Sequence, residues 1–402
     1  MRVLISGASI AGPVLAYWLT RHGFDVTVVE RGPSLRKAGG HAVDLFRPAM
    51  EISAKMGVLP RIEALATGTE RLTMYREGRP RPTEIDLTKL VGVASDRHAE
   101  IMRDDLSEIY YDAARDDVEY LFADSITAIG HDGDVEFERA AARTFDVVVG
   151  ADGLHSNVRR LVFGDEAGLT RFIGGYLAVV SAPKSLANLG EMVGHVGVGR
   201  LAAIYSADHL DDARVVFLFR RSQELAYDHR DALRQKQLLR EAFTGMHSQV
   251  DTWLDELDRT PTFYFDAITQ MRMDRWSRRR VTLVGDAGYC PGPAVGGSTS
   301  LAVLGAYVLA GELARAGGDQ LRAFAAYELE MREPVHLSRA FARGAARTII
   351  PGSRAGVWAL TRGAQLVSLM PGSLSQALAR LNTKGLRMYD SMRVPDYSEV
   401  GV

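Results

Sequence analysis

Three glycine-rich blocks carry the residues of this sequence that could bind an anionic or polyol ligand. The first, GASIAG, runs from Gly7 to Gly12 and matches the dinucleotide-binding spacing with Ser9 in place of the middle glycine. Small residues there let the backbone approach a pyrophosphate at a helix N-terminus. Glu30 follows 23 residues after Gly7, where a carboxylate can accept hydrogen bonds from ribose hydroxyls. These residues favour a nucleotide site over a purely structural turn with a surface glutamate.

The other two blocks place aspartates in similar glycine turns. The second is VGADGLHSNVRR, Val149 to Arg160, and the third is VTLVGDAGYCPGPAVGGSTSLAVLGAY, Val281 to Tyr307. In the third, a buried strand leads through Asp286 into a Gly/Pro loop and then a helix. Such an aspartate can bind a polyol chain, and the backbone amides after the loop can stabilise negative charge on a reduced cofactor or an oxyanion.

The elements expected around these blocks form a parallel sheet. Short β-branched or apolar runs predict buried strands, and apolar residues at helical spacing predict the helices between them. The expected strands are Val3–Ser6, Phe24–Glu30, Thr144–Gly153 and Val281–Val284, and the expected helices are Pro13–Arg21, Pro48–Met56, Arg103–Arg115 and Leu301–Ala316. A strand–turn–helix–strand unit therefore surrounds the first block, as the nucleotide motif requires.

A different pattern separates the second block from the third. Residues 171 to 265 alternate or carry β-branched and aromatic residues between polar turns, which predicts an antiparallel sheet interrupted by one helix near Asp231–Met246. The sequence therefore predicts a discontinuous first domain (1–170 and 272–345, with a small hairpin insertion near 71–100). A substrate-binding sheet domain would cover 171–271, and a helical segment at 346–402 would bridge the two.

Composition limits the possible partners. The chain has 402 residues, 47% of them hydrophobic and 24% charged, with a formal net charge of -2. This balance favours a globular protein without nucleic-acid or membrane partners. The single cysteine, Cys290, allows no internal disulfide and is expected to be a small buried hydrophobe. No apolar stretch has the length of a membrane span, so we expect a cytoplasmic protein. The histidines show no metal-ligand spacing.

In this order and spacing, the three blocks resemble the signatures of the class A flavoprotein monooxygenases, the FAD-dependent hydroxylases with a para-hydroxybenzoate-hydroxylase-like fold. GGHAVDLF, Gly39 to Phe46, follows Glu30 and Arg31 as it does in tetracycline-inactivating and actinobacterial polyketide hydroxylases. The resemblance implies an α/β fold with a Rossmann-like FAD-binding domain (a GxSxxG variant), an inserted antiparallel-sheet substrate domain and a C-terminal helical segment. It also implies that NADPH or NADH reduces FAD, and that molecular oxygen then forms a flavin C4a-hydroperoxide that hydroxylates an aromatic or polyketide-like molecule.

The resemblance assigns roles to individual residues. Asp152 and Arg159 would shape the approach of NAD(P)H. Arg47 and His41 are candidates for gating or substrate contact, with plain surface roles as the alternative, and Phe219, Tyr264 and Met271 are candidates for the substrate pocket. The expected cofactor-binding residues are Gly7, Ser9, Ile10, Ala11, Gly12, Glu30, Arg31, Asp44, Arg103, Asp286, Pro293, Gly296, Gly297 and Ser298.

The sequence departs from the family pattern beside the flavin, and two alternative functions stay open. Gly288 and Tyr289 replace Ala-His, and Ser298 and Ser300 replace a glycine and an asparagine beside the flavin. A flavin reductase of the same fold, similar to prenyl-chain reductases, is one alternative function. The other is a non-catalytic protein that binds a flavin or a drug. A halogenase is disfavoured because no two tryptophans lie two positions apart.

Overall fold

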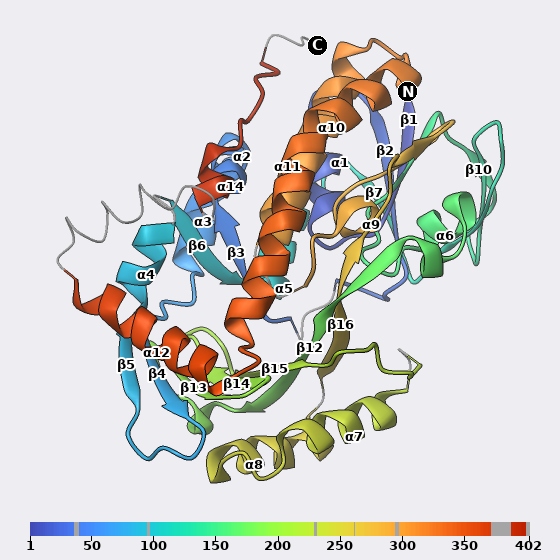
Figure 1. The fold of residues 1–402 in the computed structure, drawn as a ribbon. Coiled ribbons are helices and arrows are strands. Elements are labelled where there is room, and N and C mark those ends of the chain that lie inside the picture. Colours follow the sequence, from blue (N-terminus) through green and yellow to red (C-terminus); the bar gives the residue numbers. More distant parts are fainter. Residues whose placement is uncertain are drawn as a thin grey trace.

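A parallel sheet and a largely antiparallel sheet dominate the computed structural model (Figure 1), which describes residues 1–35, 40–94, 97–228, 231–260, 262–293, 297–370 and 387–398. The first sheet is parallel except at its β17 edge. Its strands, in spatial order, are β17 (Ser277–Arg278), β18 (Val281–Leu283), β11 (Val147–Gly150), β1 (Arg2–Ser6), β2 (Asp25–Glu30) and β7 (Glu119–Phe122).

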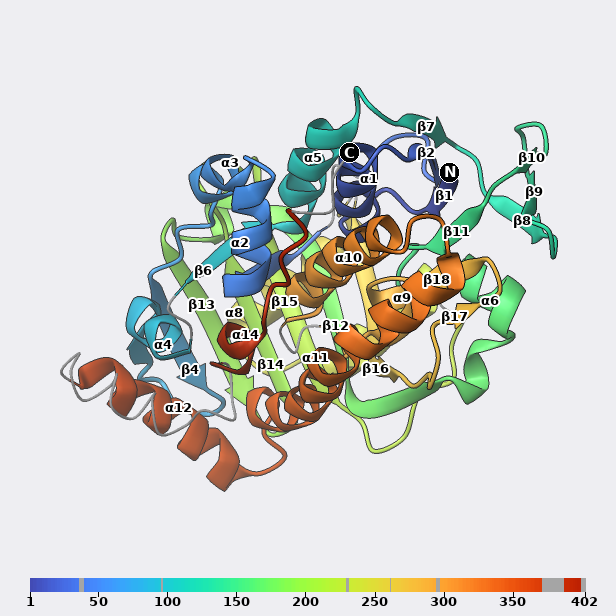
Figure 2. The same cartoon turned by 90° about the horizontal axis from the view of Figure 1, so that it is seen from above.

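The first sheet is buried because helices cover it. Val3, Leu4 and Ile5 of β1 are fully buried, as are all three valines of β11, the pattern expected of a parallel sheet enclosed on both faces. The helices that pack on this part of the chain are α1 (Ala11–Arg21), α5 (Arg103–Ala114), α6 (Asn157–Phe163), α9 (Asp286–Tyr289) and α10 (Ser298–Arg315). A small sheet of β8 (Ile126–Ile129), β9 (Asp134–Phe137) and β10 (Arg143–Thr144) lies at its edge (Figure 2).

The second sheet has seven strands, five of which lie between β11 and β18 in the sequence and two of which precede β11. Their spatial order is β16 (Phe263–Met271), β12 (Thr170–Pro183), β15 (Asp212–Arg220), β14 (Arg200–Tyr205), β13 (Glu191–Gly197), β4 (Arg71–Arg76) and β5 (Thr83–Asp86). The expected hairpin near 71–100 is β4–β5, and it extends this second sheet through a parallel pairing of β4 with β13. The hairpin therefore belongs structurally with the second sheet, although the sequence prediction placed it within the first domain.

Alternate residues of β12 face different helices. Tyr176, Ala178 and Val180 pack in one cluster with α7 (Ala232–Phe243) and α8 (Ser248–Asp255). Leu177 and Val179 pack instead against the C-terminal part of α11 (Gln320–Ile349). The prediction of a single helix here was wrong, because α8 starts a new helix at which the His247 side chain accepts a hydrogen bond from the Gln249 amide.

A two-stranded ribbon of β3 (Ala42–Phe46) and β6 (His98–Met102) adjoins α2, α3, α5 and α10. The remaining helices are α2 (Arg47–Lys55), α3 (Leu59–Ala64), α4 (Leu87–Ala94), α12 (Arg354–Leu369) and α14 (Arg387–Ser391), with single 3-10 turns at Glu166–Gly168, Lys184–Leu186 and Glu256–Asp258.

Because α11 continues to Ile349, the predicted boundary at 345 falls inside a helix; the other domain boundaries stay predictions. No helix in the described ranges is both long and apolar enough to cross a membrane.

Candidate functional site

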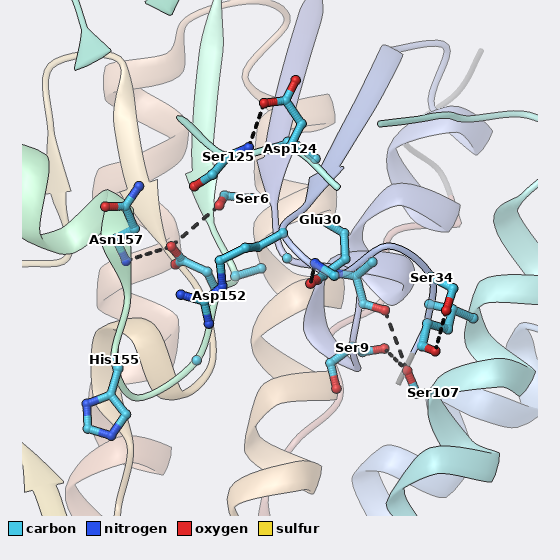
Figure 3. A pocket seen from close by; sticks show the side chains of 18 of the residues that line it. Ser6, Ser9, Glu30, Ser34, Ser107, Asp124, Ser125, Asp152, His155 and Asn157 are labelled. Carbon is cyan, nitrogen blue, oxygen red and sulfur yellow. Dashed lines mark hydrogen bonds between the residues drawn. The ribbon is translucent and has the colours of Figure 1, made fainter. Parts of the chain in front are cut away.

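A pocket of about 410 Å³ opens at the carboxyl ends of β1, β2 and β11. Figure 3 shows Asp152 between Ser6 and Asn157, and Ser9 facing Ser107. The volume is within the range of small-molecule and cofactor sites. The lining residues come from the β1–α1 turn, the end of β2, α5 and the loop after β11: Ser6, Gly7, Ala8, Ser9, Val29, Glu30, Arg31, Gly32, Ser34, Leu35, Arg103, Asp104, Ser107, Asp124, Ser125, Ala151, Asp152, Gly153, His155 and Asn157.

The β1–α1 turn has no space for larger residues at its glycines. Gly7 has a φ of 107°, and a Cβ there would lie 2.6 Å from the Ala151 carbonyl oxygen. A Cβ at Gly12 would lie 1.9 Å from the Gly7 oxygen. The N-cap residue of α1, Ile10, provides no side-chain acceptor for the first-turn amides of α1, which include that of Ala11. These amides and the positive end of the helix dipole therefore suit an anion.

Glu30 and Arg31, which the sequence predicts to hold the adenosine half of the cofactor, line the pocket at the end of β2. The Glu30 carboxylate accepts hydrogen bonds from the backbone amides of Ala8 (2.9 Å) and Gly32 (2.8 Å). It therefore fixes the β1–α1 turn against the loop after β2. Carboxylate oxygens can accept several hydrogen bonds, so Glu30 retains capacity for a ribose hydroxyl.

Two residues of α5 bind the β1–α1 turn. Arg103 Nη2 donates to Ser9 Oγ (3.2 Å), and Ser107 Oγ donates to the Ser9 carbonyl oxygen (2.9 Å). Ser9 is therefore part of the site rather than a neutral substitution. Sequence reasoning missed Ser107, although it lies one helical turn after Arg103 on the same helix face. The turn, the α1 N-terminus, Arg103 and Glu30 together fit the ADP part of FAD.

The second block has structural roles that the sequence reasoning did not assign. The Asp152 carboxylate accepts hydrogen bonds from the amides of Asn157 (2.8 Å) and Val158 (3.1 Å), so it holds the first turn of α6. Arg159 is 1% exposed and donates to the carbonyl oxygens of Ala287 (2.9 Å) and Leu154 (2.6 Å). The structure therefore does not leave Arg159 available for NAD(P)H; Asp152 lines the pocket while its carboxylate holds α6.

His155 joins the pocket wall to the seven-stranded sheet. Its Nε2 lies 3.0 Å from Asp266 of β16, and its Nδ1 lies 3.4 Å from Glu166. Hydrogen bonds to these two carboxylates raise the pKa of His155 to about 10 against the opposing effect of burial. The imidazole is therefore protonated at neutral pH. Sequence reasoning missed this residue because its partners are distant in the chain.

The third block lies beside the β3–β6 ribbon. Ser298 donates a hydrogen bond to Asp286, and the Ser300 hydroxyl accepts from the Phe46 amide (2.9 Å). Gly297 has a φ of 79°. The serines that depart from the family pattern therefore fasten the loop to Asp286 and to the ribbon. Pro293, Gly297 and Ser298 are described here, and Gly296 lies outside the described residues.

The ribbon places its candidate residues in distinct environments. Burial, and then Arg103, lowers the pKa of His41 to about 4 despite Asp44, so His41 is neutral at pH 7. Asp44 lies 2.6 Å from His98 Nε2 and does not line the pocket, so no contact supports its expected role in cofactor binding. Although burial lowers the pKa of His98, its hydrogen bond to Asp44 raises it overall.

Arg47 binds the C-terminal segment and not the pocket. Its guanidinium donates to the carbonyl oxygens of Asp390 and Met392 (3.1 Å from the latter) and pairs with Glu51 at 2.8 Å. These contacts fix α14 beside α2. Arg47 therefore has a structural role in addition to any part in gating.

The three substrate candidates do not share one environment. Phe219 is fully buried on the α7 face of the second sheet and stacks on Tyr176 at 5.1 Å. Met271 is fully buried in the core of the first sheet. These two predictions were wrong, because both side chains fill cores. Tyr264 alone lies toward the ribbon, with its ring centroid 6.2 Å from that of His41.

Comparison with known proteins identifies the family. Residues 1–330 match the family model described as FAD binding domain. A flavin-dependent monooxygenase of Legionella longbeachae is 36% identical over 349 residues, covering 85% of this chain and 87% of that protein. An uncharacterized protein of Mycobacterium tuberculosis is 44% identical over 337 residues, covering 82% and 89%. The crystal structure of tetracycline destructase Tet(51) aligns with a TM-score of 0.82 at 29% identity, covering 98% and 99%. The chain therefore belongs to the FAD binding domain family and is one of its flavin-dependent monooxygenases.

Proposed function

We propose that the enzyme consumes NAD(P)H to hydroxylate an aromatic or polyketide-like small molecule. Aromatic side chains that converge on the third glycine block carry this proposal. Phe46 stacks on Tyr389 at 4.8 Å with an interplanar angle of 11°, and a Cβ on Gly297 would lie 1.8 Å from the Tyr389 ring. The ring of His41, which directly precedes β3, lies 6.2 Å from the ring of Tyr264 in β16. Phe46 and Tyr389 are buried against each other, so the half-buried rings of His41 and Tyr264 are the ones on which a planar ligand could stack.

The side chains of the protein position the cofactor and exclude water, while bound FAD supplies electron transfer from NAD(P)H to oxygen. Glu30, Arg103 and the α1 N-terminus would hold the ADP half, and Asp286 would bind the ribityl chain. Neutral His41 beside Arg103 provides an uncharged polar group near the expected ring. In the overall reaction, one oxygen atom enters the substrate and the other leaves as water, with NAD(P)H supplying two electrons.

The similarity to a tetracycline destructase supports the substrate class, since tetracyclines are polycyclic polyketides. The test is NADPH and oxygen consumption by the FAD-loaded enzyme, with a panel of phenols and polyketides. The proposal expects one class of compound to accelerate both together. Ligand-stimulated NADPH oxidation that persists without oxygen would indicate a reductase. FAD that no ligand and no nucleotide can reduce would indicate a non-catalytic binding protein.

A further inference from the structure

Four arginines lie around Gln270 of β16, whose side chain also contacts Pro291 of the third glycine block: Arg171 pairs with Gln270 in the sheet, and Arg272 and Arg339 share hydrogen bonds with its side chain. We call them the arginine cluster: Arg171 of β12, Arg272 directly after β16, and Arg339 and Arg343 of α11. The last two are one helical turn apart and share a helix face. Gln270 organises the cluster, because its side-chain amide donates to the carbonyl oxygens of Arg339 (2.7 Å) and Pro291 (2.9 Å). Arg272 in turn donates to the Gln270 side-chain oxygen (3.1 Å).

The charges of the cluster are not paired within the described residues, although Asp274 lies close enough to act on Arg339. Within the described ranges, no carboxylate forms an ion pair with any of its members, and the guanidinium groups of Arg171 and Arg343 make no hydrogen bond. Nε of Arg272 and both Nε and Nη2 of Arg339 are buried without a hydrogen-bond partner. Burial, and then Arg272, lowers the pKa of Arg339 to about 10, although Asp274 acts in the opposite direction.

Such an arrangement is unfavourable unless an anion neutralises it. The three buried nitrogens of Arg272 and Arg339 lose their hydration and gain no hydrogen bond in return. Arg171 and Arg343 are exposed, so they form an accessible side of the cluster, while Arg272 and Arg339 lie deeper. Several guanidinium groups that converge from different elements suit a tetrahedral dianion, because each can donate two parallel hydrogen bonds to phosphate oxygens.

We propose that the arginine cluster binds a phosphorylated anion, and that the phosphates of the nicotinamide nucleotide are its ligand during turnover. Gln270, which the cluster surrounds, lies four residues along β16 from Asp266, and Asp266 binds His155 in the wall of the cofactor pocket. Four residues of a strand span about 13 Å. The inference that an anion binds here depends only on the arginine cluster. The inference that this anion is NAD(P)H also depends on the proposed function.

The test is isothermal titration calorimetry of the FAD-loaded protein with inorganic pyrophosphate, NADP⁺ and NAD⁺. The variant is Arg171→Gln/Arg343→Gln, which changes only the exposed members of the cluster. The matched control is Arg322→Gln/Arg354→Gln, which removes the same charge from exposed positions elsewhere on α11 and on α12. Losing charged hydrogen bonds should weaken binding at least about tenfold in the variant and leave the control unchanged.

The possible results of the titrations distinguish whether the anion site exists from whether the nicotinamide nucleotide is its ligand. Pyrophosphate that binds the wild type and competes with NADP⁺, with both weakened in the variant, supports the whole proposal. Pyrophosphate that binds through the cluster without competing with NADP⁺ supports an anion site and overturns the nucleotide assignment. No binding of either probe, or equal binding by variant and control, overturns the site. Because the measurement involves no turnover, failure of hydroxylation leaves these results interpretable.

Discussion

Two arginines of this enzyme, the buried Arg159 and the half-buried Arg339, have opposite surroundings. Arg159, beside the cofactor pocket, donates to two backbone carbonyls and lies 3.3 Å from Glu166. Arg339, behind the third glycine block, has two buried nitrogens without a hydrogen-bond partner and a second arginine as its neighbour. Arg159 Nε is also buried without a partner, but two carbonyls and Glu166 bind the rest of the guanidinium, so the first region pairs its charge within the protein before any ligand arrives. The second holds excess positive charge, which is expected where a ligand supplies the anion.

The largest expected effect is a loss of stability when Arg159, whose guanidinium is bound within the protein, is replaced. Arg159→Met removes the cation that joins the second and third blocks and leaves two carbonyls unpaired. We expect a loss of about 3–5 kcal/mol in the free energy of unfolding, because each buried carbonyl left without its donor costs about 1–3 kcal/mol and methionine restores neither hydrogen bond. Urea unfolding of the holoenzyme measures it, with Arg160→Met as an exposed control. Equal small losses in both variants would contradict the structural role of Arg159.

A second substitution tests whether the pocket beside the β1–α1 turn binds FAD. Arg103→Ala removes the guanidinium that donates to Ser9 at the phosphate end of the pocket. Hydrogen bonds from charged groups contribute about 1.5–3 kcal/mol, so FAD affinity should fall roughly 10- to 100-fold. Flavin fluorescence titration of the apoprotein gives the dissociation constant. Arg115→Ala, an exposed residue that follows α5, should retain FAD fully; a full FAD content in both variants would move the phosphate site elsewhere.

Replacing Arg339 in the arginine cluster should change the free energy of unfolding in the opposite direction from replacing Arg159. Arg339→Met replaces an unpaired cation with an apolar side chain of similar length. Without phosphate, the variant should unfold with the same free energy as the wild type or about 1 kcal/mol more. Added pyrophosphate should raise the melting temperature of the wild type only, since a ligand stabilises the state that binds it. A destabilisation as large as that of Arg159→Met would show that the two arginines have the same structural role.

The smallest effect concerns the charged link between the pocket and the second sheet. The folded pKa of His155 is about 10 and its ordinary value is 6.5, so its contribution to stability is complete below pH 6.5 and declines as the pH rises through 10. His155→Gln should therefore unfold at a lower temperature than the wild type at pH 6, with the difference shrinking toward pH 10. The side chain is 45% exposed, so we expect about 1 kcal/mol or less. A difference independent of pH would contradict this assignment.

The parts of the fold that local patterns determine could be predicted from the sequence. The βαβ unit around Gly7 depends on a short buried strand, a tight turn and a helix, and all of these leave local signals. Glu30 follows from the length of that unit. The helix at Ser248–Asp255 was missed because it is short, and its N-cap is a histidine rather than one of the usual capping residues.

The roles that depend on distant partners could not be predicted. Arg159 is in a recognisable motif, but its contact with Ala287 joins residues 128 positions apart. Phe219 and Met271 have the residue types of a substrate pocket, yet the face of the strand that each occupies is set by which helices cover the sheet. The arginine cluster assembles from β12, β16 and α11, so no local pattern contains it. Whether a charged side chain has a partner of opposite charge depends on tertiary contacts, so it can be determined only from the folded structure.

The most direct test of the proposed function is mass analysis of the product formed under ¹⁸O₂ with NADPH and the panel compound that best stimulates turnover. The proposal predicts a product that carries one labelled oxygen atom, formed in proportion to the NADPH consumed. An unlabelled product, or label recovered only in hydrogen peroxide and water with every stimulating compound, would contradict a hydroxylating monooxygenase.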